Sequence, residues 1–527
     1  MKQNSVNQQK TNQKTKPLRY CIFMALLSGA LLFLSFPVFG LSFAAWFALV
    51  PLFAALRGTD TMKRAFFLGW LTGCAAYTGI LYWIVYVVVN YGHMPVYMGI
   101  ACMLLLVCYL SIYTGLFAAA TVYLRNTVPL YLAAPFLWVV TEYLKSKVIT
   151  GFPWENLGYS QFNNFYFIQI ADIVGVFGLS FLIVLLNVAI SGLINERSKK
   201  TIALAAGVCL LWAGVYAYGM IRVEQVREAM KHKKEMSVSL AQGNIDQSIK
   251  WSANFQKETI DIYEHLSLQD DSGREDLVIW PETAVPFNFE AESSLRRRVQ
   301  GIAAQTGKWL VFGAVSFNPH KQNTDFFNSA YLLSPAGEIR GRYDKVHLVP
   351  YGEYVPLRNV FPFISSLTAG IGDFGKGAGF HPLNMDNEKI GVMICYEGIL
   401  PEAGRMYKNE GAGVLVNITN DAWFGRTSAP YQHLSMAIFR AVETRLYLVR
   451  AANTGISAVV DPCGKITVRT EIFKKDVIHD KIKFIEMPSF YARHGDWPVA
   501  VSFALLVVFL ILSLAWRIKH VRRKFTR

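Results

Sequence analysis

Three residues that can take part in acyl chemistry lie beside short apolar runs in the sequence. Cys395 follows the apolar run 390–394, and Glu282 follows the run 277–280 and one proline. Lys345 lies between a polar turn and an apolar stretch. Short runs that contain β-branched residues are typical of buried strands. We therefore expect these three side chains at the ends of strands, where they can face a cleft.

Together the three residues have the groups that acyl transfer through a thiol requires. A cysteine that attacks an acyl carbon must lose its proton, and a nearby carboxylate can accept it. The tetrahedral oxyanion that forms then needs a positive charge or N–H donors. Glu282 would be the base, Cys395 the nucleophile and Lys345 the cation. The alternative for Cys395 is an ordinary core cysteine, because free cysteines are among the most buried residues.

The composition indicates a membrane protein. The chain has 527 residues, of which 53% are hydrophobic and 14% aromatic, more than soluble proteins usually contain. Its formal net charge of +15 could suggest a nucleic-acid partner. The basic residues are spread through the tails and short loops, however, and form no single stripe. We therefore interpret them as signals of membrane topology and expect no nucleic-acid partner.

Apolar segments long enough to span a membrane follow a polar tail at residues 1–19, which we expect to be disordered and cytoplasmic. There are eight, at 20–36, 41–56, 66–89, 96–124, 130–145, 166–194, 202–221 and 498–516. With the tail inside, the positive-inside rule is satisfied by Arg57, Lys63, Arg64, Arg125, Arg197, Lys199, Lys200 and the terminal segment 519–527. Lys145 and Lys147 fall on the outer side and are exceptions.

The hydropathy pattern predicts four parts of the chain. After the tail, residues 20–221 form a membrane domain of seven helices, 222–495 form a polar insert outside the cytoplasmic membrane, and 496–527 form a last helix with a basic cytoplasmic tail. In the insert, apolar runs alternate with helix-like stretches, which favours an α/β fold. Residues 431–448 have helical spacing, and we expect a packed structural helix there.

The insert contains two of the seven cysteines, Cys395 and Cys463. Their number and spacing give no disulfide framework, so Cys463 is interpreted as incidental. No cluster of His and Cys has the spacing of a metal site, and we expect neither a metal nor another cofactor. His347 follows Lys345 by two positions, and a structural hydrogen bond is its expected role.

The contexts of the three candidate residues resemble a known superfamily. Glu282 lies in WPET, Lys345 in YDKVHLVPYGEYVP and Cys395 in ICYE. This order resembles the nitrilase, or carbon–nitrogen hydrolase, superfamily, whose fold is an αββα sandwich. The resemblance implies that these residues are the catalytic triad.

Further motifs are similar to one branch of that superfamily, the apolipoprotein N-acyltransferase family. They are AQGNIDQSIKW near Trp251, VPYGEYVP around Glu353 and NITNDAWFG around Trp423. The similarity extends over roughly residues 235 to 490, and the predicted membrane spans also fit. It implies acyl transfer from a phospholipid, through a Cys395 thioester, to the α-amino group of the lipidated N-terminal cysteine of an apolipoprotein.

The same resemblance implies roles for further residues, each with an ordinary alternative. Glu353 would hold Lys345 charged and oriented, although a carboxylate in such a turn is usually just solvated. Glu397 would support the site, or simply start a helix. Tyr396 and Trp251 would line the acyl cleft and its mouth, or be core aromatics. Trp423 would also contact substrate.

The implied partners are a phospholipid donor, a diacylglyceryl apolipoprotein acceptor and membrane lipids, bound by a monomer in the cell inner membrane with its catalytic domain on the periplasmic side. A substrate with several acyl chains stays in the bilayer, which accounts for the many spans. The glycine-rich stretch 370–380, with the apolar residues 360–364 before it, is either a lid that touches the bilayer or an ordinary flexible loop.

Two other functions remain open. A membrane-anchored amidase or nitrilase that acts on small molecules would use the same triad. A lipid-handling or transport protein with a decayed hydrolase domain is the second, but the intact contexts of Glu282, Lys345 and Cys395 speak against decay. We expect no charged residues within the spans, which speaks against ion-coupled transport.

Overall fold

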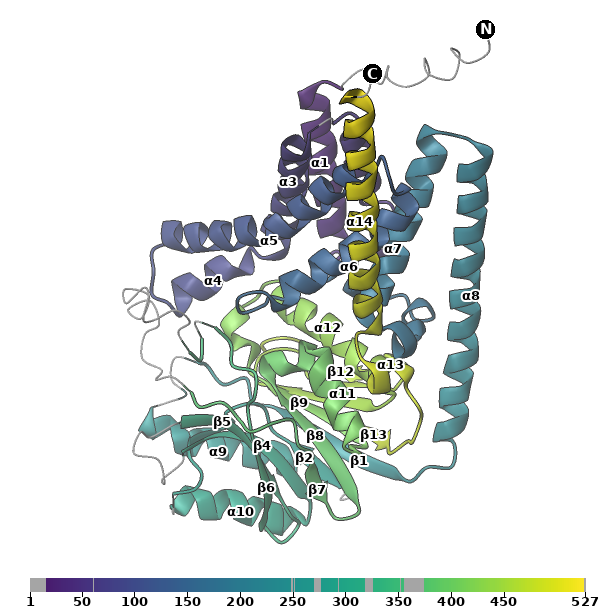
Figure 1. Ribbon diagram of the computed structural model, residues 1–527. Helices are drawn as coiled ribbons and strands as arrows, with labels where there is room; N and C mark the ends of the chain where they lie inside the picture. Colours follow the sequence, from purple (N-terminus) through teal and green to yellow (C-terminus); the bar gives the residue numbers. More distant parts are fainter. Residues whose placement is uncertain are drawn as a thin grey trace.

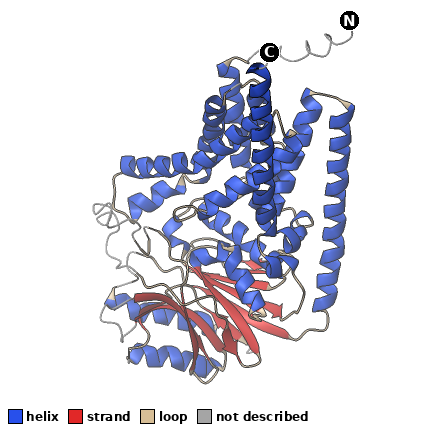
Figure 2. Cartoon of the chain, viewed as in Figure 1, coloured by secondary structure: helices blue, strands red, loops and turns tan. Residues whose placement is uncertain are grey.

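The computed structural model of the chain describes residues 16–59, 61–247, 250, 252–269, 276–291, 293–317, 326–350, 352–354 and 374–525. It consists of a bundle of helices and a two-sheet sandwich at one end of that bundle (Figure 1). We call residues 16–230 with 497–525 the helical part, and residues 235–487 the sandwich part. The strands all belong to the sandwich part (Figure 2). A short helix, α13 (Phe490–His494), joins the sandwich part to the last helix.

The helices of the helical part follow the apolar segments of the sequence. Ser198 caps the longest one, accepting a hydrogen bond from the Thr201 backbone N–H at 3.2 Å. The elements are α1 (Leu18–Leu34), η1 (Ser42–Trp46), α2 (Val50–Arg57), α3 (Met62–Ile80), α4 (Trp83–Asn90), α5 (Val96–Leu124), α6 (Leu130–Lys147), η2 (Leu157–Gln161), η3 (Phe167–Ile170), α7 (Ala171–Asn195), α8 (Lys199–Met230) and α14 (Trp497–Phe525).

Several of these helices are long and apolar enough to cross a membrane. In the described chain there are four: α5, α7 with η3, α8 and most of α14. The pair α3 and α4 makes a fifth if it counts as one span, although it is bent by 57°. α1 and the segment Ser42–Arg57 are apolar but shorter. All eight predicted apolar segments coincide with helices, but length and hydropathy alone do not qualify each of them as a span.

The expectation that the spans lack charged residues is wrong for α7, which contains the buried Asp172, and for α6. Glu142 and Lys145 are both buried in this helix. The Lys145 ammonium donates a hydrogen bond to the Trp154 carbonyl at 3.0 Å, and Glu142 accepts one from the Leu157 backbone N–H at 2.6 Å. Such partners from the following loop allow charged groups to remain inside a helix bundle.

The basic loops gather at the end of the bundle that is remote from the sandwich (Figure 1). There Arg57 pairs with Glu196 at 2.9 Å, and Arg125 donates to the Thr59 carbonyl at 2.6 Å. Lys147 lies at the other end, where it pairs with Glu402 of the sandwich part at 3.5 Å. The two exceptions to the charge rule thus have local partners, because Lys145 is buried and Lys147 contacts the sandwich.

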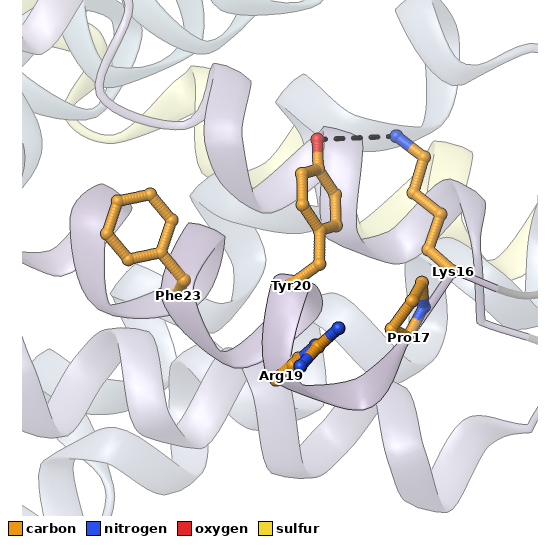
Figure 3. Close-up of a pocket in the computed structure, with 5 residues that line it drawn as sticks. All are labelled: Lys16, Pro17, Arg19, Tyr20 and Phe23. Carbon is orange, nitrogen blue, oxygen red and sulfur yellow. Dashed lines mark hydrogen bonds between the residues drawn. The ribbon is translucent and has the colours of Figure 1, made fainter.

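A surface cavity of about 700 Å³ lies at the start of α1, on the side of the basic loops (Figure 3). The Lys16 ammonium lies 3.4 Å from the Tyr20 hydroxyl at its edge. Its lining residues are Lys16, Pro17, Arg19, Tyr20 and Phe23. None of the residues with expected catalytic roles belongs to this cavity.

The sandwich part contains two mixed sheets. The first has the order β13-β1-β2-β4-β5-β6, with β3 beside β4, and the second has the order β12-β11-β10-β9-β8-β7. The strands are β1 (Glu235–Gln242), β2 (Leu277–Ile279), β3 (Val285–Asn288), β4 (Trp309–Phe317), β5 (Phe326–Leu333), β6 (Ile339–Asp344), β7 (Leu383–Met385), β8 (Glu388–Ile394), β9 (Val414–Thr419), β10 (Tyr447–Ala452), β11 (Ala458–Val460), β12 (Ile466–Arg469) and β13 (Asp476–Lys483).

The apolar runs of the insert at 237–241, 277–280, 309–315, 390–394 and 414–418, each predicted to be a strand, form β1, β2, β4, β8 and β9. The first three are parallel neighbours in one sheet, and β8 and β9 are parallel neighbours in the other. Strands in parallel pairs are buried on both faces, so their residues are apolar almost without interruption. This is why these strands are the ones that the hydropathy pattern reveals.

Helices cover the outer faces of both sheets. The inner faces pack together through residues such as Leu240, Val311 and Val416. α9 (Ala253–Leu268) and α10 (Ser294–Thr306) pack on the first sheet, and α11 (Pro401–Asn409) and α12 (Ala429–Thr444) pack on the second. The predicted αββα sandwich is confirmed.

α12 lies between the second sheet and the helical part. Ala437 and Ile438 pack toward the sheet, whereas Met436 and Phe439 belong to the core of the helical part. The predicted structural helix over 431–448 is therefore present, but its last residues belong to β10. The helix ends at Arg445, whose φ of 56° is left-handed and stops the helical hydrogen bonding.

Candidate active site

Cys395 occupies the corner where β8 ends and the short helix η5 (Cys395–Ile399) begins. Its φ is 54°, a left-handed conformation that is costly for a residue other than glycine. Its carbonyl oxygen accepts a hydrogen bond from Asn417 Nδ2 at 3.2 Å and lies 3.2 Å from His433 Nε2. The nucleophile candidate thus lies at a strained corner that neighbouring side chains hold.

Glu397 fixes this corner from the other side. Its carboxylate is fully buried and accepts hydrogen bonds from three backbone N–H groups, of Ile394 at 2.8 Å, Val346 at 2.7 Å and His347 at 2.9 Å. The Tyr343 hydroxyl lies 2.9 Å from both oxygens. Glu397 therefore ties the end of β8 to the loop after β6, the loop that begins with Lys345.

Glu282 lies three residues beyond β2, and the surrounding chain holds both of its oxygens. Oε1 accepts a hydrogen bond from Asn328 Nδ2 at 2.7 Å, and Oε2 accepts one from the Asn420 backbone N–H at 2.8 Å. Lys345 Nζ lies 3.8 Å from Oε1. The Glu282 side chain is only 8% exposed, so this carboxylate has a fixed orientation.

Lys345 forms its shortest ion pair with Glu353, at 2.8 Å from Nζ to Oε1. Asn328 Nδ2 also donates to that oxygen at 2.9 Å, and the Val349 backbone N–H donates to Oε2 at 2.9 Å. Burial alone would lower the pKa of Lys345, but the carboxylates of Glu353 and Glu282 raise it above its usual value. Lys345 is therefore positively charged at neutral pH.

The charges of Glu282 and Lys345 both act on the Cys395 thiol. Burial raises the pKa of the thiol, Glu282 raises it further and Lys345 lowers it, with a result of about 12. At neutral pH the resting cysteine is consequently protonated and needs a base to become a nucleophile. The structure brings Glu282, Lys345 and Cys395 into one electrostatic cluster with Glu353 beside it.

Aromatic rings join this corner to the helical part. The Tyr396 ring stacks on Trp154, from the loop after α6, with centroids 6.3 Å apart. On the loop after β6, His347 stacks on Tyr396 at 5.6 Å. The His347 backbone N–H donates to Glu397, whereas the structural hydrogen bond expected of its side chain stays a prediction.

Trp423 lies in another contact between the two parts. Its ring meets that of Tyr91, the residue after α4, with centroids 4.7 Å apart. The Tyr91 hydroxyl donates to the Ala422 carbonyl at 2.8 Å. Trp251 lies outside the described residues, as do residues 360–364 and 370–373 of the expected lid.

Several residues of the site did not stand out in the sequence. Asn328 of β5 bridges Glu282 and Glu353, but it is a single amide within a strand that is otherwise largely apolar. The buried Lys250 donates to Thr283 Oγ1 at 2.6 Å and to the Glu282 carbonyl at 3.2 Å. A signal did exist for Asp421, because the polar residues of NITND interrupt an apolar strand at its end.

Cys463 is buried with a free thiol. In the described part of the chain, no group of three or more His, Cys, Asp or Glu residues is arranged to hold a metal ion. The candidate site itself offers a carboxylate, an ammonium and a thiol, from Glu282, Lys345 and Cys395. Such a set can cleave an ester or amide through an acyl-thiol intermediate.

Comparisons with known proteins cover nearly the whole chain. Residues 28–189 match the Apolipoprotein N-acyltransferase N-terminal domain, and residues 237–487 match the Carbon-nitrogen hydrolase family. An apolipoprotein N-acyltransferase of Geobacter metallireducens is 44% identical over 515 residues, which is 95% of this chain and 96% of the relative. One from Pasteurella multocida is 32% identical over 94% of this chain and 96% of its own. A solved amidase from Nesterenkonia sp. has 19% identity and a TM-score of 0.37, covering 52% of this chain and 98% of its own.

Proposed function

The chain belongs to the apolipoprotein N-acyltransferase family and is an acyltransferase of lipoprotein biosynthesis, and we propose that Glu282, Lys345 and Cys395 carry its reaction. One observation supports this assignment above the others. Glu282 and Lys345 both act on the thiol of Cys395, and Glu353 and Asn328 hold them in place. Lipid and lipoprotein are the two substrate classes of this family.

The first half of the reaction acylates the enzyme. Glu282 takes the thiol proton while Cys395 Sγ attacks the ester carbonyl of a phospholipid acyl chain, and Lys345 stabilises the oxyanion. When the tetrahedral intermediate collapses, the carbon–oxygen ester bond breaks and Glu282 returns the proton to the leaving alkoxide. A lysophospholipid departs, and the acyl chain remains as a thioester on Cys395.

The second half transfers the acyl chain to an amine. The acceptor is the α-amino group of the diacylglyceryl-modified N-terminal cysteine of an apolipoprotein. The amine attacks the thioester carbonyl, Glu282 accepts an amine proton, and the carbon–sulfur bond breaks as that proton returns to Cys395. A thioester lies uphill of an amide, so this step needs no nucleotide. Water must be kept from the thioester, and the aromatic contacts around Tyr396 favour this.

We also infer how the chain lies in the membrane. The eight apolar segments predicted from the sequence would each span the membrane. Residues 1–19 and the end of the chain would lie in the cytoplasm, and residues 222–495 would form a periplasmic catalytic domain. The basic residues Arg57 and Arg125 support this orientation, since their loops lie at the end of the bundle remote from the sandwich. The membrane would be the cell inner membrane, and the chain would act as a monomer.

An acceptor assay separates this function from that of a membrane-anchored amidase. The purified protein is incubated with a defined phospholipid and a synthetic diacylglyceryl lipopeptide that has a free α-amine. We expect the lipopeptide to gain one acyl chain, and an otherwise identical lipopeptide with an acetylated amine to gain none. Release of ammonia from small amides, with no acylation of the free-amine lipopeptide, would instead support the amidase.

A further inference from the structure

A buried charged network lies behind the nucleophile and is not used by the proposed reaction. It consists of Asp421, His433 and Arg450, and each of these side chains is fully buried. Arg450 Nη2 donates to Asp421 Oδ2 at 2.8 Å, and Asp421 Oδ1 accepts a hydrogen bond from the Thr419 hydroxyl at 3.0 Å. An ion pair with no exposure to water costs desolvation energy, so its presence calls for a reason beyond stability.

The network reaches the Cys395 peptide through His433. The Nδ1 atom of His433 lies 3.1 Å from Asp421 Oδ1 and 3.1 Å from Arg450 Nη2. Its Nε2 atom lies 3.2 Å from the Cys395 carbonyl oxygen. Because a carbonyl can only accept, Nε2 must carry the proton. Burial and Arg450 lower the pKa of His433, although Asp421 raises it, so the ring is neutral. Nδ1 then carries no proton, so it accepts from Arg450 and makes no hydrogen bond with Asp421 Oδ1.

A second branch of the network reaches the same carbonyl through an amide. Arg450 Nη1 donates to Asn417 Oδ1, which fixes the orientation of this side chain. Asn417 Nδ2 then donates to the carbonyl oxygens of Cys395 at 3.2 Å and Met393 at 3.0 Å. Arg450 thus holds both donors that point at the Cys395 peptide.

The backbone conformation of Cys395 is one that neighbouring residues must maintain. Cys395 has a φ of 54°, and a non-glycine residue keeps such a conformation only where its surroundings impose it. The same torsion sets the direction of the Cys395 side chain relative to Glu282 and Lys345. If the carbonyl were released, the corner could relax and the thiol would leave the position in which both charged groups act on it.

We propose that His433, anchored by Arg450, which Asp421 holds in turn, is a positioning residue that holds the Cys395 carbonyl and so keeps the thiol aligned with Glu282 and Lys345. The inference rests on the proposed function in one respect, that Cys395 is the nucleophile. His433 is not a catalytic residue in this account, because its contact is with the Cys395 backbone. The ring packs between Trp154 and Phe424, so a role in packing alone is the alternative that must be tested.

Two variants of similar size separate the hydrogen bond from the packing. His433→Gln keeps a side-chain N–H that can reach the carbonyl, whereas His433→Met fills the same space without a donor. We would measure thioester formation on Cys395 against phospholipid concentration in the full chain. We expect His433→Met to lower the maximal rate about tenfold with an unchanged half-saturating concentration, and His433→Gln to stay within about threefold of wild type.

Alkylation of Cys395 by iodoacetamide gives a second readout that requires no acyl donor. The tryptic peptide 390–405 carries this cysteine alone, so its modification can be followed separately from that of the other thiols. We expect slower alkylation in His433→Met than in His433→Gln. If wild type forms no thioester while this order of alkylation rates holds, the proposed function fails and the positioning role stands.

Two results would overturn the inference: wild-type rates in His433→Met, or equal losses in His433→Gln and His433→Met. Should His433→Met fail to fold, Asn417→Asp makes the same test from the other branch. This variant keeps the oxygen that accepts from Arg450 and removes the Nδ2 donor to the Cys395 carbonyl. It should then show the same loss of maximal rate, and a folded Asn417→Asp protein with wild-type rates would overturn the role of the network.

Discussion

The Trp154 ring of the helical part stacks on the ring of Tyr396, with centroids 6.3 Å and planes 21° apart. Tyr396 directly follows Cys395, so a residue from the loop after α6 packs against the catalytic corner. Trp154 also donates its Nε1–H to Gln432 of α12 at 2.8 Å. The helical part therefore packs directly against the residue that follows Cys395, the proposed nucleophile.

Removing the Trp154 ring should disturb both stability and activity. We expect Trp154→Ala to cost about 3 kcal/mol or more of stability, because a large buried ring leaves a cavity. Acyl transfer should fall at least about tenfold as the support of Tyr396 is lost. Trp516→Ala is the matched control, since this ring contacts only the tilted ring of His520 on its own helix among the aromatic rings of the described residues, with centroids 3.9 Å apart. Thermal unfolding in detergent and the lipopeptide assay give the two measurements, and equal effects of both variants would contradict the prediction.

Replacing Glu282 should make the Cys395 thiol more acidic and the enzyme less active. Burial, Glu282 and Asp421 raise the pKa of this thiol, so Glu282→Gln removes one of these three causes while Lys345 still lowers it. At pH 9 the variant should carry more thiolate and react faster with iodoacetamide than wild type. Acyl transfer should nevertheless fall by about 100-fold or more, because the general base is gone.

The control for Glu282→Gln is Glu471→Gln, at an exposed carboxylate that pairs with Lys474 at 2.7 Å. It should change neither the alkylation rate nor the transfer rate. Slower alkylation in Glu282→Gln than in wild type would show that Glu282 does not act on the thiol as the structure indicates.

Glu353 should determine how far into alkaline pH the enzyme works. Its carboxylate and that of Glu282 raise the pKa of Lys345, so Glu353→Gln lowers this pKa. The variant should lose the Lys345 charge at a lower pH than wild type, and its activity should decline earlier as the pH rises. Even at neutral pH we expect a loss of about tenfold, because Lys345 is no longer oriented.

A pH profile of acyl transfer for Glu353→Gln, compared with Glu402→Gln, tests this prediction. Glu402 also pairs with a lysine, Lys147, but both side chains are more than half exposed. Exposed pairs contribute little, so this control should follow the wild-type profile. Identical alkaline limits for the two variants would contradict the assigned role of Glu353.

Replacing Glu397 should mainly lower the stability of the protein, because this residue holds the structure of the site. Three backbone N–H groups and the Tyr343 hydroxyl surround its carboxylate. In Glu397→Gln an NH₂ group must face some of these donors. This unsatisfied contact should lower the free energy of unfolding by about 2 kcal/mol or more. The thermal unfolding midpoint should fall accordingly. An unchanged midpoint together with lost activity would instead place Glu397 among the reacting groups.

The strands that could be predicted from the sequence are those buried on both faces. β8 and β9 appear as continuous apolar runs because parallel neighbours and covering helices exclude water from them. β10 could not be distinguished from α12 in the sequence, because its apolar residues continue the helical spacing of that helix. The boundary between the two elements depends on the left-handed conformation of Arg445. β12 has no buried residue and β13 has only Ile478 and Ile482 buried, which makes such edge strands difficult to recognise.

The candidate triad could be predicted because each member follows or adjoins an apolar run. The partners that hold it could not, since Asn328 and His433 come close to Glu282 and Cys395 only through the pairing of sheets and the packing of α12. Glu142 shows the opposite case, a charged residue within an apolar segment whose partners come from the following loop. Hydropathy describes the solvent around a segment and says little about such tertiary partners.

In the proposed reaction, Cys395 carries the acyl chain between the two substrates. The most direct test is the intact mass of the purified protein after incubation with a defined phospholipid and no acceptor, before and after hydroxylamine. We predict the gain of one acyl chain, its loss with hydroxylamine, and no hydroxylamine-sensitive gain in Cys395→Ser. A folded wild-type protein that gains no mass with any phospholipid tested, or an equally hydroxylamine-sensitive gain in Cys395→Ser, would contradict the account.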